Sequence, residues 1–383
     1  MAYALRILAI FGLLALGSAA IAQEKHGVTR TYYIAADEVD WDYVPSGMDM
    51  MMGMAPRGYA KFYTQHGRGY IGKVYRKAIY REYADATFTH LKPRPPQDSY
   101  LGAVGPIVHA EVGDTVKIVF RNHGTHPYSV HPHGVFYEKA SEGSPYADGV
   151  ADANKGGAAV APGKTFTYTW QVRERAGPGP NDPSSIVWLY HSHVDERRDV
   201  NAGLIGAIVV TRQGMARPDG TPKDVDHEFA ALFMFYDENQ SWFIDDNIKR
   251  FVKKTKKFTK LDIVPIDSKG NLDLLLGSGL GPANFRYAIN GYQFANMPMM
   301  RMRKGEHVRW YVIAMGEGFS FHTPHWHGNI VVVNGQRTDV LNLGPASMIT
   351  ADMFPDDPGI WLFHCHVSDH MEGGMVARYQ VLP

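Results

Sequence analysis

Short runs of hydrophobic residues, rich in Val, Ile, Tyr, Phe and Thr, recur along the chain and are interrupted by Gly, Pro, Asn and Asp. Clear examples lie at 115–120, 165–170, 204–210 and 307–313. Runs of β-branched and aromatic residues bounded by turn formers are typical of strands in β-sandwiches, and not of helical or α/β folds. We therefore predict an all-β chain built from sandwich domains.

The pattern also repeats once along the chain. The corresponding segments are EVGD at 111–114 with RKGE at 303–306, HPHG at 131–134 with HWHG at 325–328, and IVWLYHSH at 186–193 with GIWLFHCH at 359–366. Internal similarity of this kind indicates two copies of one structural unit.

A stretch rich in Gly and Pro separates the two copies. We predict a first domain over 23–213, a linker over 214–226 and a second domain over 227–383. Residues 1–22 contain Arg6, an apolar run and a small-residue A-x-A site, a pattern typical of a cleaved secretory signal. An exported chain, periplasmic or secreted, follows from that pattern.

Charge and cysteine content narrow the function classes. The chain has 383 residues with 39 basic and 39 acidic side chains, a balance that argues against a nucleic-acid partner. No later stretch is apolar enough to span a bilayer, so we expect no membrane partner. A single Cys excludes a disulfide framework and a Cys-rich zinc or iron–sulfur site, whereas 18 His make imidazole the metal ligand to examine.

Four H-x-H pairs carry the main chemical signal: His131 and His133, His191 and His193, His325 and His327, and His364 and His366. Residues i and i+2 of a strand point to one face, so each pair presents two imidazoles side by side. Imidazole ligates Cu, Zn and Fe. One pair alone is ordinary on a strand surface. Four pairs at equivalent places of two repeats exceed the needs of one zinc or iron, and they suit a cluster of three metals.

The one cysteine, Cys365, points to the opposite strand face from its two histidine neighbours. With His322, His370 and Met375 it provides one thiolate, two imidazoles and a thioether, the ligand set of a blue copper site. Met375 taken alone reads as core packing, but its offset from Cys365 favours a ligand. Because the two neighbours of Cys365 form one of the H-x-H pairs, the chain itself supplies a covalent route for electrons between the two sites.

The same offsets in the first repeat give Tyr128, Ser192, Arg197 and Ala202. None of these is a good copper ligand. We expect the first repeat to contribute imidazoles to the cluster but to hold no blue copper.

Together these residues resemble the multicopper oxidases, in particular ceruloplasmin and hephaestin reduced to two domains, as in two-domain laccases. The segments that carry the resemblance are YHSHVD at 190–195, DENQSW at 237–242, AING at 288–291, HTPHWHG at 322–328 and the run 354–375 that contains HCHVSDHMEGGM. The resemblance implies two cupredoxin-like Greek-key sandwiches. It also implies about four coppers per chain, one type 1, one type 2 and two type 3.

Position by position, the resemblance assigns His131 and His325 to the type 2 copper. It assigns the type 3 pair to His133, His191, His193, His327, His364 and His366. The implied reaction oxidises a donor one electron at a time and reduces O₂ to water. Asp195 is a candidate for proton delivery, and Asp369, beside His370, for contact with the donor.

The larger relatives close six such domains into a ring, so three copies of this chain would rebuild the ring as a homotrimer. Each cluster would then lie between the first domain of one subunit and the second domain of its neighbour.

The donor remains open between a phenol or aromatic amine and a metal ion such as Cu(I), Fe(II) or Mn(II). In ferroxidase relatives the position of Asp369 helps to bind iron, but Pro282 and Tyr287 replace a Glu and a His of that iron site. Thioethers select Cu(I), and five of them lie in one loop: Met48, Met50, Met51, Met52 and Met54. A second methionine group, at 297–302, reads as core packing.

Three alternatives use part of the same pattern. A two-domain copper nitrite reductase would carry its blue copper in the first domain and would need only three imidazoles at its second site. A non-enzymatic copper-binding or electron-transfer protein would have no use for the four H-x-H pairs. A cupin or zinc hydrolase would leave Cys365 and Met375 unexplained.

Overall fold

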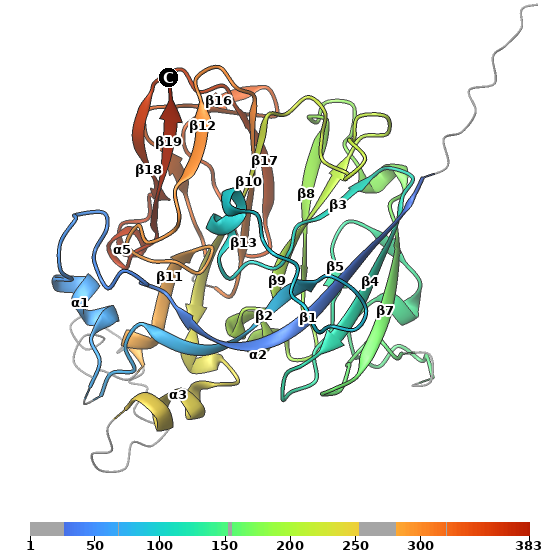
Figure 1. Ribbon diagram of the computed structural model, residues 1–383, viewed down its shortest axis with the longest axis horizontal. Coiled ribbons are helices and arrows are strands. Elements are labelled where there is room, and N and C mark those ends of the chain that lie inside the picture. The colour runs from blue at the N-terminus through green and yellow to red at the C-terminus, as the bar shows by residue number, and fades with distance from the viewer. Residues whose placement is uncertain (1–26, 68, 152–154, 253–280, 319) are drawn as a thin grey trace, which may run out of the picture.

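The computed structural model describes residues 27–67, 69–151, 155–252, 281–318 and 320–383. Strands dominate this part of the chain and the helices are short, so the prediction of an all-β fold is confirmed (Figure 1). The predicted secretory signal lies outside the described residues. No helix in the described part is long and apolar enough to cross a bilayer.

The first half of the chain forms two sheets. The five-stranded sheet has the order β2-β1-β4-β7-β6 and comprises β1 (Thr29–Asp42), β2 (Val74–Tyr83), β4 (Thr115–Asn122), β6 (Phe136–Tyr137) and β7 (Thr165–Gln171). The four-stranded sheet has the order β3-β9-β8-β5 and comprises β3 (Val108–Glu111), β5 (His131–Pro132), β8 (Ser185–His191) and β9 (Ile205–Thr211).

The second half forms two further sheets. The six-stranded sheet has the order β11-β10-β13-β17-β15-β16 and comprises β10 (His227–Asp237), β11 (Phe285–Ile289), β13 (Val308–Met315), β15 (Val331–Val333), β16 (Gln336–Thr338) and β17 (Met348–Met353). The four-stranded sheet has the order β12-β19-β18-β14 and comprises β12 (Met300–Arg303), β14 (Pro324–Trp326), β18 (Gly359–Cys365) and β19 (Val376–Leu382).

The internal repeat of the sequence is also a repeat of topology. β1 runs parallel to β4 as β10 runs parallel to β13, and β3 runs parallel to β9 as β12 runs parallel to β19. β8 pairs antiparallel with β5 and β9, as β18 does with β14 and β19. The H-x-H segments therefore occupy equivalent places in two equivalent sheets. The domain boundaries at 213 and 227 stay predictions.

Short helices lie in the connections between strands. They are α1 (Gly58–Thr64), α2 (Glu196–Ala202), α3 (Ile244–Phe251) and α5 (Ser368–Glu372), with short 3₁₀ helices η1 (Pro96–Leu101), η2 (Lys139–Ser141), η4 (Glu174–Ala176), η5 (Glu238–Gln240) and η6 (Pro282–Asn284). Two of them bear on the candidate site, because α2 follows the H-x-H pair after β8 and α5 follows the pair after β18.

The sheet that contains β8 and β9 is covered on both faces. Ile208 and Val210 face the core between the two first-half sheets, whereas Val187, Ala207 and Val209 belong to the core of the second half. Every residue of β9 is accordingly buried, which explains the unbroken apolar run in its sequence. β8 packs on β13 and β17 of the second half.

The connection between β9 and β10 is folded back onto the first half. Ala216 pairs with Pro222 in an antiparallel bridge, and the Thr211 hydroxyl donates to the Gly220 carbonyl. Gly214, Pro218 and Gly220 lie in two turns, closed by bonds from the Met215 N–H to the Arg212 carbonyl and from the Gly220 N–H to the Arg217 carbonyl.

Candidate metal centre

The first group of imidazoles lies at the paired ends of β5 and β8. His131 is the register partner of His191, and the backbone N–H of His133 donates to the Leu189 carbonyl. His193 lies two residues beyond β8. These four histidines are here called the N-terminal tetrad. Their rings contact one another in five pairs, with centroids 5.1–5.5 Å apart.

Hydrogen bonds orient two rings of the N-terminal tetrad. His131 donates through Nδ1 to the Glu142 carbonyl at 2.6 Å, and His191 through Nδ1 to the Ser192 carbonyl at 3.1 Å. Because a carbonyl can only accept, Nδ1 carries the proton and Nε2 keeps a free lone pair. Nε2 of His191 lies 3.2 Å from Nε2 of His133. The arrangement directs imidazole lone pairs toward one another, as in a site for a cation.

The second group, His325, His327, His364 and His366, repeats this arrangement at β14 and β18 and is here called the C-terminal tetrad. Five pairs of these rings are in contact, with centroids 4.8–5.6 Å apart. His325 donates through Nδ1 to the Asp339 carbonyl at 3.0 Å, and His364 through Nδ1 to the Cys365 carbonyl at 2.8 Å. Nε2 of His327 and Nε2 of His364 are 3.0 Å apart. The two tetrads thus share one internal geometry.

Burial keeps several of these imidazoles neutral. It lowers the pKa of His133 and of His364 to about 4, and it holds the pKa of His191 well below its usual range. Neighbouring histidines lower the pKa of His133 further. Neutral rings with free lone pairs are the form in which histidine binds metals.

A glycine directly follows the first H-x-H pair of each tetrad, and sterics require it there. Gly134 and Gly328 have φ angles of +74° and +71°, which favour glycine. A Cβ atom on Gly134 would lie 2.1 Å from the Trp188 ring, and one on Gly328 would lie 2.5 Å from the Trp361 ring. The two tryptophans pack against the turns that end the H-x-H-G segments, and so they fix the direction of those turns.

A third group lies inside the second-half core, on the other side of β18. The sulfur of Cys365 is 3.6 Å from Nδ1 of His370 and 3.9 Å from Nδ1 of His322, and the two Nδ1 atoms are 3.1 Å apart. All three side chains are buried. Burial lowers the pKa of His322 to about 3 and that of His370 to about 4, while it raises the pKa of the Cys365 thiol.

These three residues fit a bound soft metal ion. A sulfur and two neutral ring nitrogens converge within 4.8 Å of one another, and Nε2 of His322 is buried without a hydrogen-bond partner in the described residues. Met375 is buried beside them, since its carbonyl accepts from the Cys365 N–H and its N–H donates to the His370 carbonyl. One sulfur and two imidazoles, with Met375 as the candidate thioether, match the donor set of a mononuclear copper site.

Within one chain the two tetrads are far from each other. The tetrads lie in different sheets, and among the described residues no ring of one contacts a ring of the other. In Figure 1 β5, which contains His131, lies on the right of the molecule, whereas α5, which follows the C-terminal tetrad, lies on the left. A single subunit therefore presents two separate groups of four imidazoles.

The structure corrects one correspondence between the repeats. In the second repeat the Cys365 N–H donates to the Met375 carbonyl at 3.1 Å, and the Met375 N–H donates to the His370 carbonyl at 2.9 Å. In the first repeat the same two bonds join Ser192 to Leu204 at 3.1 Å and Leu204 to Asp199 at 3.1 Å.

Asp199 and Leu204, and not Arg197 and Ala202, are therefore the counterparts of His370 and Met375. The physical reason is that α2 has seven residues and α5 only five, so equal offsets drift by two positions. Asp199 is the buried residue that the sequence patterns missed. Counting back from the closing glycine would have found it.

The two predicted carboxylates lie at the protein surface. Asp195 caps α2, accepting from the Arg198 N–H at 3.3 Å, and its role in proton delivery stays a prediction. Asp369 is exposed in the first turn of α5, next to His370. The ring of Tyr287 packs on the ring of His370 with centroids 4.9 Å apart. Tyr287 and Asp369 thus both lie beside His370, Tyr287 against its ring and Asp369 next to it in the chain.

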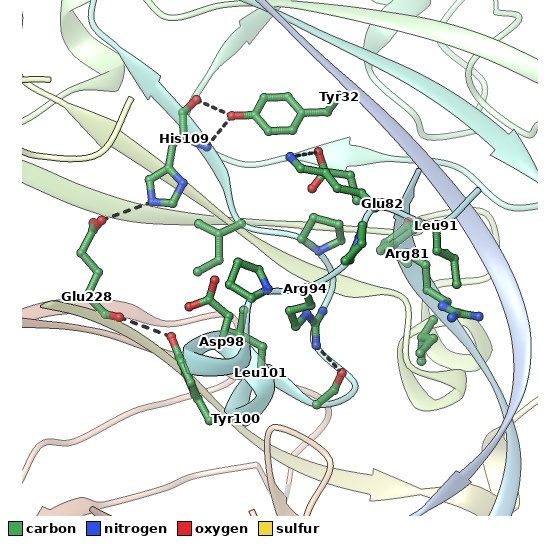
Figure 2. Close-up of a pocket in the computed structure, with 18 of the residues that line it drawn as sticks. Tyr32, Arg81, Glu82, Leu91, Arg94, Asp98, Tyr100, Leu101, His109 and Glu228 are labelled. Carbon is green, nitrogen blue, oxygen red and sulfur yellow. Dashed lines mark hydrogen bonds and ion pairs between the residues drawn. The ribbon is translucent and has the colours of Figure 1, made fainter. Parts of the chain in front are cut away.

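A cavity of about 870 Å³ lies elsewhere, between η1, β3 and the start of β10. Figure 2 shows the His109 ring facing the Glu228 carboxylate, with Nε2 and Oε2 3.5 Å apart. None of the candidate metal ligands lines this cavity.

Comparison with known proteins agrees with this geometry. Two family models described as multicopper oxidase match residues 101–214 and 266–383. The chain is 42% identical to human Ferroxidase HEPHL1 over 357 residues, which cover 92% of this chain and 29% of that protein. It is 38% identical to mouse Hephaestin and to human Ceruloplasmin, covering 30% and 31% of their lengths. The chain thus spans less than a third of these relatives.

Solved structures support the fold. The crystal structure of Blue Copper Oxidase from Nitrosomonas europaea superposes with a TM-score of 0.55 at 19% identity, over 92% of this chain and 86% of that one. The crystal structure of a second multicopper oxidase superposes with a TM-score of 0.55 at 19% identity, over 92% of this chain and 89% of that one. The sheets are those of cupredoxin-like sandwiches, as predicted. With both halves matched by its family models, the chain belongs to the multicopper oxidase family.

Proposed function

We propose that this protein oxidises a one-electron donor and passes the electrons to O₂, which is reduced to water. The observation that carries the proposal is the position of Cys365 between His364 and His366. Its sulfur faces His322 and His370 in the core, whereas its neighbours belong to the C-terminal tetrad. A buried sulfur joined by consecutive residues to a histidine cluster suits transfer of electrons from one site to the other.

Copper would supply the redox chemistry, with one ion held by His322, Cys365, His370 and Met375 and three ions held by the eight tetrad histidines. The chain's own residues provide the rest. The core around Cys365 excludes water, and the carbonyls of Glu142 and Asp339 fix the tautomers of His131 and His325. In each tetrad two rings turn their Nε2 atoms toward each other: His133 and His191 in the first, and His327 and His364 in the second.

We further propose a homotrimer in which the N-terminal tetrad of one subunit meets the C-terminal tetrad of the next. The separation of the tetrads within one chain supports this assembly, because neither group alone offers enough ligands for three metals. Exposed apolar side chains near the C-terminal tetrad support a buried interface there: Phe321 is 61% exposed and Ile330 50%. In a head-to-tail ring of three copies, every N-terminal tetrad is paired with a C-terminal tetrad of a neighbouring subunit.

Among the possible donors we propose a metal ion, and Cu(I) in particular. The loop 48–54 is held against the turn that precedes Met375: the Met50 N–H donates to the Phe294 carbonyl, and the Phe294 N–H donates to the Gly374 carbonyl. Met51, Met52 and Met54 of this loop are exposed, so thioethers are offered to solvent close to the Cys365 group. The second group differs, since Met297, Met300 and Met302 are buried in the core.

Two measurements on the purified protein test the activity. We expect about four coppers per chain and uptake of O₂ with a generic one-electron donor. About two coppers per chain with nitrite reduction would instead indicate a copper nitrite reductase. Strong visible absorption without O₂ uptake would indicate an electron carrier. The predicted signal at 1–22 supports export, which cell fractionation would test.

A further inference from the structure

The first repeat keeps the backbone of the Cys365 site but fills it with a hydrogen-bonded cluster. Ser192 replaces Cys365, and its hydroxyl accepts from the Ser129 N–H at 3.0 Å where the cysteine sulfur accepts from the Thr323 N–H at 3.4 Å. Tyr128 makes the same paired backbone bonds to Val160 that His322 makes to Leu343. The frame is thus conserved between the repeats although its side chains are not metal ligands.

Asp199 is the central acceptor of this cluster. Its side chain is fully buried and accepts four hydrogen bonds. Oδ2 accepts from the Ser192 hydroxyl at 2.6 Å and from the N–H groups of Val194 and Asp195, both at 3.1 Å. Oδ1 accepts from the indole N–H of Trp242 at 2.8 Å. Such a fully satisfied carboxylate fixes every group that donates to it.

The donors to Asp199 surround the N-terminal tetrad. Ser192 lies between His191 and His193, and Val194 follows directly. The His193 N–H donates to the hydroxyl of Ser129 at 3.0 Å, so the strand segment that carries His131 is tied to the same cluster. Through these bonds one carboxylate holds both backbone segments that present the tetrad.

The second half of the chain also contributes to this cluster. Trp242 ends the DENQSW segment at 237–242, and its ring lies between the Arg198 guanidinium, 4.6 Å from the ring centroid, and the His126 ring, which stacks on it at 4.2 Å. The Asp237 N–H donates to the side chain of Asn201 in α2. The motif therefore clamps α2 against the sheet that carries the tetrad.

We propose that Asp199 is a positioning residue for the N-terminal tetrad, the first-repeat substitute for the cross-link that a metal at Cys365 provides in the second repeat. The inference rests on the proposed function in one respect only, that the tetrad binds copper. An apolar filler would occupy the same space at less cost, because a buried carboxylate must recover its lost hydration through its donors. The carboxylate of Asp199 instead holds the backbone of residues 191–195 in place through its hydrogen bonds.

The primary test is Asp199→Asn, with Asp114→Asn as the matched control. Asp114 is also a buried carboxylate of the first half, accepting from the N–H groups of Val28 and Glu111 and from Arg30, but at the β3–β4 turn. In the metal-free proteins, we expect amide hydrogen exchange of 191–195 to speed up at least about tenfold in Asp199→Asn, with 364–367 unchanged. Asp114→Asn leaves both segments unchanged.

Copper loading provides a second readout. We expect the cluster of Asp199→Asn to bind copper about 10- to 100-fold more weakly, while the visible absorption per chain that depends on Cys365 is retained. Trp242→Phe removes one donor and keeps an aromatic ring, although a smaller one, and we expect it to shift exchange and copper binding in the same direction by less. It also serves as the test should Asp199→Asn fail to fold.

Two results would overturn the inference, and a third concerns the proposed function alone. Unchanged exchange at 191–195 in both variants, or an equal loss of the visible absorption and the cluster copper, would show that Asp199 does not position the tetrad. A wild-type protein that loads no copper into the tetrads would instead refute the proposed function, and the exchange data would still decide the role of Asp199.

Discussion

The sulfur of Cys365 lies 3.6 Å from Nδ1 of His370, inside a core that water does not reach. A thiolate bound to copper in such a place gives an intense colour and cannot be replaced by a hydroxyl. We expect Cys365→Ser to abolish the visible absorption, to remove about one copper per chain and to stop O₂ uptake. Absorption spectra and copper analysis check this, and a coloured Cys365→Ser protein would contradict the assignment.

Mixing two inactive variants tests the proposed trimer. A subunit with His131→Ala and His193→Ala keeps an intact C-terminal tetrad, and one with His325→Ala and His366→Ala keeps an intact N-terminal tetrad. If clusters form between subunits, co-expression restores activity at about a quarter of the interfaces. Clusters formed within one chain would give no restoration. Light scattering of the active wild-type protein would then report the mass of a monomer.

Acid is expected to destabilise the metal-free protein through its buried histidines. Burial lowers the pKa of His322 to about 3 and of His370 to about 4, whereas the unfolded chain takes up these protons near about 6.5. Between those values the unfolded chain binds more protons, so the free energy of unfolding falls as the pH falls. The slope is about 1.4 kcal/mol per pH unit for each histidine.

Urea unfolding of the metal-free protein from about pH 7 to about pH 5 measures that slope. His322→Leu should reduce the slope by the contribution of one histidine, about 1.4 kcal/mol per pH unit. An equal slope in the variant would mean that His322 titrates normally in the folded protein.

A buried ion pair joins the two halves of the chain. Nζ of Lys77 lies 2.5 Å from Oε1 of Glu238, both side chains are fully buried, and the lysine also donates to the Asn201 carbonyl. Removing one partner leaves a buried charge unpaired, so Glu238→Gln should lower the free energy of unfolding by about 3–5 kcal/mol. Chemical denaturation measures this. Replacing both residues by apolar ones should cost less, and a larger loss in the double variant would contradict the charge argument.

Donor preference can be read from initial rates on Cu(I), Fe(II), Mn(II) and a phenol. Replacing Met51, Met52 and Met54 by Leu keeps the loop apolar and removes its soft ligands. We expect the rate on Cu(I) to fall about tenfold or more, with the phenol rate unchanged. Asp369→Ala should lower the rates on all three metal ions, because it removes an exposed carboxylate beside His370. A uniform loss in the methionine variant would indicate damage to the Cys365 group.

Much of this fold can be predicted from short-range patterns in the sequence. The runs of β-branched and aromatic residues located β4, β7, β9 and β13. The two histidines of each H-x-H pair share a strand face because the side-chain period of a strand is two. The position of Cys365 on the face opposite to its neighbours follows from the same rule. These inferences need only the geometry of one strand.

Other features depend on loops and on tertiary packing. The two extra residues of α2 moved the counterpart of His370 from Arg197 to Asp199, and no strand period reports the length of a helix in a connection. The bond from Trp242 to Asp199 joins residues from different halves, so only the folded chain reveals it. The distance between the two tetrads likewise depends on how the sandwiches pack.

The sheet of β8 and β9 makes the stability of each half depend on the other. Its outer side chains, Val187, Leu189, Ala207 and Val209, complete the core of the second half, although the strands belong to the first. A first half produced alone would present this apolar face to water and would aggregate. The second half would lack one wall of its core. We therefore expect the two repeats to unfold in a single transition, and neither to persist as an independent module.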